Sequence, residues 1–275
     1  MPVRPERSAR SVVDRKTSSA RRHEPARAAF ALIALVLALC ALAPTPLRAQ
    51  GASPASTPAG APAPTPRPAP DSMDARVRAC TGCHGDQGRA TADGYYPRIA
   101  GKPAGYLANQ LRNFRDGRRA VPAMTWMVEH LSDDYLGEIA AHFADRHPPY
   151  PPPPPPAASA EVLERGRRLV REGDPARRLP ACVACHGDGL LGMQPAVPGL
   201  LGLPRDYLNA QLGAWLGGTR RAMPPDCMAT IVRRMPAEDI AAVTAWLAAQ
   251  PVPAAARPAA ALPATLPLDC GGLGR

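Results

Sequence analysis

Apolar residues recur at helical spacing in two separate stretches of the chain. In each stretch an apolar stripe is followed by glycine, a residue that commonly ends a helix. The stripes consist of Tyr106, Leu107, Leu111 and Phe114 before Gly117, and of Tyr207, Leu208, Leu212 and Trp215 before Gly217 and Gly218.

Each stretch closes with a second amphipathic helix. The first is predicted to begin after Ser132, a favourable N-cap followed by two acidic residues, and the second at Pro236. Their apolar positions are Leu136, Ile139 and Phe143 in one helix and Ile240, Val243 and Trp246 in the other. Neither stretch alternates apolar and polar residues as a half-buried strand does. The pattern therefore predicts an all-α fold.

The two stretches are copies of one another. The sequence ACTGCHGD at 79–86 returns as ACVACHGD at 181–188, an offset of 102 residues. Seven further positions recur at an offset of 101: Pro97, Gly101, Tyr106, Leu107, Gln110, Leu111 and Gly117 correspond to Pro198, Gly202, Tyr207, Leu208, Gln211, Leu212 and Gly218. A matched series of this kind indicates a duplicated domain.

Proline-rich segments mark the domain boundaries. The chain contains 36 prolines, and such a composition is typical of linkers and tails rather than of packed structure. We predict a disordered Pro/Ala-rich spacer at 50–70, a first domain at 71–147, a stiff polyproline linker at 148–158, a second domain at 159–250 and a Pro/Ala-rich tail at 251–275.

Residues 1–49 are predicted to be an export signal. An Arg-rich stretch precedes sixteen apolar residues, Ala28–Ala43, a run that is short for a membrane span and suits the core of a signal peptide. Cleavage is expected before Gln50, and an uncleaved N-terminal anchor is the alternative. The same 49 residues hold nine basic and three acidic side chains, and so contribute much of the net charge of +10. Elsewhere no basic stripe with interleaved aromatic residues is visible, which argues against nucleic acid as a partner.

Each copy carries the sequence Cys-x-x-Cys-His. Two thiols three positions apart on a helical turn can add to the two vinyl groups of one haem, and the histidine that follows can ligate its iron. We therefore predict two covalently bound haem c groups, attached through Cys80, Cys83 and His84 and through Cys182, Cys185 and His186.

Three other uses of these cysteines compete with haem attachment. A redox dithiol is expected within a βαβ pattern, which is absent. A structural zinc site would join the two pairs, yet each copy has its own histidine and its own domain. Simple disulfides are a third use in an exported chain.

A c-type haem iron needs a sixth ligand, and methionine gives the carriers of higher potential. The first copy offers Met124 and Met127, and the second Met223 and Met228. Met124 lies seven residues before the pair Leu131-Ser132 and Met228 seven residues before the pair Met235-Pro236, the pairs that open the last helices, whereas Met127 and Met223 have no counterparts. The repeat thus predicts Met124 and Met228 as iron ligands, with core packing as the alternative role.

Three histidines have no copy in the second domain. His130, His142 and His147 are ligand candidates in principle. Because the repeat does not reproduce them, we predict that they are surface or structural residues.

The order of these motifs resembles the diheme cytochrome c4 family. In each copy CxxCHG is followed by P-x-[IL]-x-G, Y-L-x-x-Q-L, G-x-R, a methionine and a closing amphipathic helix, over roughly 79–144 and 162–247. The resemblance implies two tandem class I cytochrome c-like domains, with His84–Met124 and His186–Met228 as the axial pairs.

This chain departs from the family pattern in three places. The helix before Cys80 is short and lacks the glycine that Gly166 provides in the second copy. A polyproline run joins the domains, which argues against the close packing of haems typical of the family. The tail after Gln250 is additional.

Filled axial positions leave no open iron for a substrate, and no base, nucleophile or metal-bound water constellation is apparent. We therefore expect an electron carrier rather than an enzyme, located in the periplasm. It would pass single electrons between periplasmic or membrane-bound redox proteins of a respiratory chain, a terminal oxidase among them. The alternatives are a membrane-anchored subunit of an oxidase or dehydrogenase complex, and a diheme sulfur-compound dehydrogenase in which a Cys227 thiolate ligates iron.

Two cysteines and a set of arginines remain to be explained. Cys40 lies in the predicted signal, so Cys227 and Cys270 are expected to form a disulfide that pins the tail to the loop of Met228. The arginines are candidates to pair with haem propionates or an acidic partner, a solvated face being the alternative. They are Arg98, Arg118, Arg119, Arg220 and Arg221.

Overall fold

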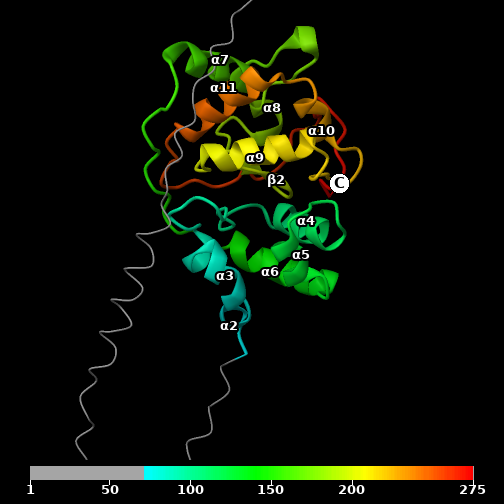
Figure 1. Ribbon diagram of the computed structural model, residues 1–275. Coiled ribbons are helices and arrows are strands. Elements are labelled where there is room, and N and C mark those ends of the chain that lie inside the picture. Colours follow the sequence, from blue (N-terminus) through cyan, green and yellow to red (C-terminus); the bar gives the residue numbers. More distant parts are fainter. Residues whose placement is uncertain (1–70, 275) are drawn as a thin grey trace, which may run out of the picture. The chain divides into compact units, whose positions relative to one another are not determined.

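The structure is a computed structural model that describes residues 71–274 of the 275-residue chain (Figure 1). The predicted signal at 1–49, with its alternative of an N-terminal anchor, and the predicted spacer at 50–70 lie outside these residues. Across 71–274, none of the helices has the length and apolar character needed to cross a membrane.

The first domain is built around a pair of packed helices. Its elements are α2 (Met73–Arg76), α3 (Arg78–His84), the 3₁₀ helix η1 (Asp86–Gly88), α4 (Ala104–Arg115), α5 (Pro122–Val128) and α6 (Asp133–Ala144). Helices α4 and α6 pack together, and burial of Leu107, Ile139 and Phe143 between them drives that contact. Ser132 caps α6 by accepting a hydrogen bond from the Tyr135 amide, as its sequence position predicts.

The second domain repeats this plan with a longer first helix. Its elements are α7 (Ala160–Arg171), η2 (Pro175–Arg177), α8 (Val183–His186), β1 (Gly192–Met193), β2 (Val197–Pro198), α9 (Arg205–Leu216), α10 (Cys227–Val232) and α11 (Ala237–Ala248). The two short strands pair antiparallel. Two helix-dominated copies of one plan confirm the predicted all-α fold of two tandem domains.

Helices α7 and α11 lie side by side (Figure 1) because Gly166 lets their backbones approach closely. A Cβ atom at Gly166 would lie 2.2 Å from the Ala242 carbonyl oxygen. Asp239, with a fully buried side chain, reinforces the pair by accepting a 2.6 Å hydrogen bond from Arg165 Nε. The first domain lacks such a glycine, and its equivalent segment is divided between the short helices α2 and α3. The abbreviated helix predicted before Cys80 is therefore present.

The polyproline linker and the tail are both packed against the domains. The guanidinium of Arg98 stacks on the Tyr150 ring at 3.8 Å, and it donates a hydrogen bond to the Pro148 carbonyl. In the tail, the Ala259 amide donates to Gly192 at 2.9 Å, and Ala259 accepts from the Gln194 amide at 2.8 Å. These segments form part of the fold although they contain no helix or strand.

The two domains contact each other through matched residues. Arg119 Nη2 donates to Gln211 at 2.6 Å and to Tyr207 at 3.2 Å. Backbone bonds accompany them, from the Ala120 amide to Thr219 at 2.8 Å and from the Arg221 amide to Arg118 at 2.7 Å. The polyproline linker thus does not keep the domains apart.

Candidate haem-binding sites

Two buried histidines end the short helices that carry the cysteine pairs. His84 is the last residue of α3 and His186 the last of α8, and each is 8% exposed. Their Nδ1 atoms lie 2.8 Å from the carbonyl oxygens of Pro97 and Pro198, respectively. Because a carbonyl can only accept, Nδ1 carries the proton and donates it, so that Nε2 keeps a lone pair for a metal ion.

Both imidazoles are held in the neutral form that binds metals. Burial lowers the pKa of His84 and of His186, and the bond to the proline carbonyl offsets part of this effect. The charge of Arg119 lowers the pKa of His84 further, and that of Lys102 does the same for His186. Each histidine is therefore neutral and oriented before any ligand binds.

Three of the four motif cysteines are unsuited to thiol–disulfide exchange. None of them is bonded to another cysteine. Burial raises the pKa of the Cys80 and Cys185 thiols and raises the pKa of Cys182 to about 12. A redox dithiol needs the opposite, a thiol of lowered pKa. A zinc site also lacks support, because no three His, Cys, Asp or Glu side chains converge on one point in residues 71–274.

A largely apolar cavity lies beside His186. Its wall includes Cys182, Cys185 and Met228 of the second domain and is completed by residues of α4 from the first. An apolar cavity, two unbonded thiols and a histidine with a free Nε2 fit a haem c, a flat macrocycle with two vinyl groups and a central iron.

The candidate axial methionines lie on equivalent helices. Met124 is on α5 and Met228 on α10, and both stand eight residues before the N-cap of the closing helix, Ser132 or Pro236. Met124 packs in the small core of Phe114, Val128 and Leu136. The rivals are also nearby: Met127 contacts the same core, and Met223 lines the cavity beside His186 but is 42% exposed.

The five candidate arginines divide into different roles. Arg119 and Arg220 are buried between the domains, 8% and 6% exposed. Arg98 is buried against the linker, Arg118 bonds to Asn113 and Asp116 of its own domain, and the Arg221 side chain is exposed. The alternative of a solvated face therefore fails for Arg98, Arg119 and Arg220.

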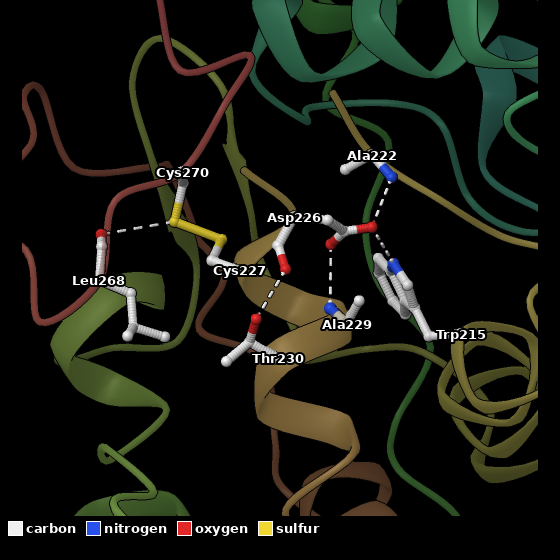
Figure 2. The surroundings of a disulfide bond; sticks show 8 residues. All are labelled: Trp215, Ala222, Asp226, Cys227, Ala229, Thr230, Leu268 and Cys270. Atoms are coloured by element: carbon white, nitrogen blue, oxygen red, sulfur yellow. Dashed lines mark hydrogen bonds between the residues drawn. A yellow bond between two sulfur atoms is a disulfide. The ribbon is translucent and has the colours of Figure 1, made fainter. Parts of the chain in front are cut away.

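The Asp226 carboxylate organises the loop that carries Met228. It accepts hydrogen bonds from the amides of Ala229 at 2.9 Å and Ala222 at 2.7 Å, and from the Trp215 indole at 3.2 Å (Figure 2). The next residue, Cys227, is disulfide-bonded to Cys270, with the two Cα atoms 5.2 Å apart. The predicted disulfide is confirmed, and it holds the tail beside α10.

The tail also closes the cavity of the second domain. Leu266, Leu268 and Leu273 contribute to the cavity wall. Gly272 accepts a hydrogen bond from Asn109 of α4, which links the tail to the first domain. The cavity is therefore bordered by three parts of the chain that are far apart in sequence.

The three unrepeated histidines do not line the cavity beside His186. His130 is exposed and lies 3.4 Å from the Glu129 carboxylate. His142 lies beside Arg146 and Asp74, and the Gly101 turn approaches His147. These contacts are structural, as predicted.

Some residues of the sites escaped sequence reasoning. Pro97 and Pro198 were visible as repeated positions, but their role lies in backbone carbonyls that no side-chain pattern reveals. Lys102 gave no signal, because its repeat partner is Leu203. Gln110 and Tyr106 did recur in the second copy, and that repetition of polar residues within an apolar stripe was the available sign of a shared interface.

The chain resembles known proteins over about three fifths of its length. It is 37% identical over 174 residues to the thiosulfate dehydrogenase electron acceptor of Thiomonas intermedia, covering 63% of this chain and 79% of that protein. It is 32% identical over 175 residues to cytochrome c4 of Pseudomonas aeruginosa, covering 63% and 84%. No protein-family model matches it.

Solved structures share the fold. Cytochrome c4 from Pseudomonas stutzeri aligns with a TM-score of 0.55 at 28% identity, over 63% of this chain and 94% of that one. Thiosulfate dehydrogenase (TsdBA) from Marichromatium purpuratum aligns with a TM-score of 0.56 at 36% identity, over 62% and 36%.

Duplicated helical domains, each with a Cys-x-x-Cys-His motif and a carbonyl-oriented histidine, define a diheme c-type cytochrome with two covalently bound haems. The sequence identity and coverage of the cytochrome c4 relatives also identify the family. The chain belongs to the cytochrome c4 family of electron-transfer proteins.

Proposed function

We propose that this chain is a periplasmic carrier that accepts single electrons from a thiosulfate dehydrogenase and delivers them to a respiratory acceptor. The observation that carries the proposal is the pairing of two oriented histidine sites in domains joined by reciprocal Arg–Gln hydrogen bonds. Such an arrangement suits passage of electrons through one chain. Similarity to two thiosulfate dehydrogenase electron acceptors supports the choice of donor.

We also propose that His84 with Met124 and His186 with Met228 are the axial ligands. The support is the common register of α5 and α10, and the position of Met228 in the cavity wall with His186. When bound, haem c supplies reversible one-electron chemistry. The residues of the chain hold it covalently, present a neutral imidazole and restrict water.

The alternative of a sulfur-compound dehydrogenase rested on a free Cys227 thiolate. In the structure this sulfur is bonded to Cys270, so it offers no thiolate to iron. Two relatives, each matched over most of its own length, bear the name thiosulfate dehydrogenase electron acceptor. Both observations favour the carrier.

Stopped-flow absorption tests the proposal directly. The purified holoprotein is mixed with thiosulfate alone, and then with thiosulfate and a catalytic amount of thiosulfate dehydrogenase. We expect reduction of two haems per chain in the second mixture and none in the first. Reduction by thiosulfate alone would identify an enzyme, and no acceleration by the dehydrogenase would refute this choice of donor.

The proposed periplasmic location is tested by the mature N-terminus. Protein recovered from the periplasm should begin at Gln50 if 1–49 is a cleaved signal. Recovery only from membranes, with 28–43 retained, would instead support the anchored subunit.

A further inference from the structure

Lys102 is a buried basic residue that has no ion-pair partner in residues 71–274, and burial lowers its pKa. It is 8% exposed, and it is the one lysine of this part of the chain, where the other basic residues are arginines. None of the ion pairs there includes it. Removing an ammonium group from water without a counter-charge is costly. An anion is therefore expected beside it.

Lys102 belongs to the first domain but lines the cavity of the second. It lies in the turn that leads into α4, after Gly101 with φ +71°. The wall that it shares includes His186, Cys182 and Cys185.

Two buried arginines extend the positive region. Arg220 lines the same cavity, and Arg119 lies beside it. Their side-chain hydrogen bonds go to uncharged oxygens, those of Gln110 and Gln211 and of the tyrosines Tyr106 and Tyr207. Burial alone would raise the pKa of Tyr106, but the charges of Arg220, Arg119 and Lys102 outweigh it and lower the pKa. Three cations thus gather where no carboxylate of residues 71–274 is paired with them.

The chemistry of haem c supplies the missing anion. The macrocycle is apolar except for two propionate carboxylates, and its binding motif forms part of this cavity wall. We propose that Lys102 binds a propionate of the haem attached at Cys182 and Cys185, across the domain boundary, and raises the reduction potential of that haem. The assignment rests on the haem site proposed above.

The rise in potential follows from charge. Reduction of the iron adds one negative charge, and a nearby cation in a site of low dielectric favours the reduced form. Lys102 thereby becomes a tuning residue that the first domain contributes to the second. The repeat makes the effect one-sided, because the residue equivalent to Lys102 in the second domain is Leu203. The two haems should therefore differ in potential for this reason.

A redox titration of Lys102→Met tests the proposal. Methionine has a similar length and no charge. Arg168→Met is the matched control, since it removes an exposed positive charge from α7, where water and salt screen it. The potentials are assigned to the two sites with Met228→His. We expect Lys102→Met to lower the potential of the second haem more than that of the first, and Arg168→Met to change neither.

Equal potentials in Lys102→Met and wild type, with both haems retained, would overturn the proposal. A wild-type protein without two haems, or unchanged potentials in Met228→His, would instead contradict the haem sites proposed above. The two failures are therefore distinguishable.

A second measurement needs no variant. Protein labelled with ¹³Cε-lysine gives one side-chain signal from residues 71–274, because Lys102 is the one lysine there. We expect this signal to shift strongly between the oxidised and reduced states, since the paramagnetic ferric iron is close. An unchanged shift would place Lys102 away from the haem and refute the assignment.

Discussion

At the scale of the residue, the sixth ligand decides the potential of each haem. Thioether sulfur stabilises ferrous iron relative to a second imidazole. Met124→His is therefore expected to lower one potential, leave the other nearly unchanged and remove half of the methionine-to-iron charge-transfer band. Met228→His should do the same to the other haem. A redox titration followed by absorption measures both effects.

The neighbouring methionines provide the comparison. Met127→Leu, on the same helix as Met124, should keep both bands and cost at most about 1 kcal/mol, because the two side chains have similar volumes. Loss of the second band in Met223→Leu would show that the register of the second domain is wrong by five residues.

Single residues were predictable where the repeat and the chemistry of haem attachment indicate the same positions. The spacing of Cys80, Cys83 and His84 specifies a haem by itself, and its recurrence at 182–186 specifies a second one. The charge at Lys102 was not predictable, because its importance comes from a wall that belongs to another domain. The same holds for the carbonyl of Pro97, whose bond to His84 depends on the path of the chain.

At the scale of the element, the tail depends on one covalent bond. The Cys227–Cys270 disulfide closes a segment with a sequence separation of 43, and a bridge over a loop of that length contributes up to about 4 kcal/mol by restricting the unfolded chain. Cys227→Ser with Cys270→Ser should therefore lower the free energy of unfolding by up to this amount, measured by chemical denaturation. Two free thiols in the wild type, found by mass spectrometry after anaerobic preparation, would contradict the bridge.

The haem sites provide the control for the disulfide variant. Met228 and Asp226 remain in place, so both charge-transfer bands should persist at low denaturant. The tail should become sensitive to limited proteolysis, because only hydrogen bonds and packing then hold it, among them those of Ala259 to Gly192 and Gln194 and that of Gly272 to Asn109. Equal proteolysis rates with and without the disulfide would show that the bridge does not hold the tail.

Helices were more predictable than the segments between them. The caps and apolar stripes of α4, α6, α9 and α11 follow from local rules of capping and burial. The composition of 251–275 indicated only a proline-rich tail, since backbone pairing such as that of Ala259 leaves no side-chain pattern. The polyproline linker likewise required a distant partner, the stacking of Arg98 on Tyr150.

At the scale of the whole molecule, the repeat predicted two domains but not how they meet. Its polar members Tyr106, Gln110 and their copies recur within apolar stripes, and in the structure they receive hydrogen bonds from Arg119 and Arg220. A chain of two equal halves gains a reciprocal interface when each half places the same donor and acceptor at the contact. The composition of the linker did not predict this contact, because a stiff linker can still join two domains that pack against each other.

The interface makes a prediction about cooperativity. Arg119→Ala removes two hydrogen bonds across the domain boundary, to Gln211 and Tyr207, and leaves a buried gap between the domains. The contact should weaken by roughly 2–3 kcal/mol, since hydrogen bonds from charged groups are worth about 1.5–3 kcal/mol each and part is regained from water. We expect the calorimetric unfolding of the holoprotein to broaden or to split into two transitions.

Arg118→Ala is the matched control, because the Arg118 side chain bonds only to Asn113 and Asp116 of its own domain, and it should leave the transition shape unchanged. The same single, sharp transition in Arg119→Ala and in wild type would mean that the two domains are held together by other contacts.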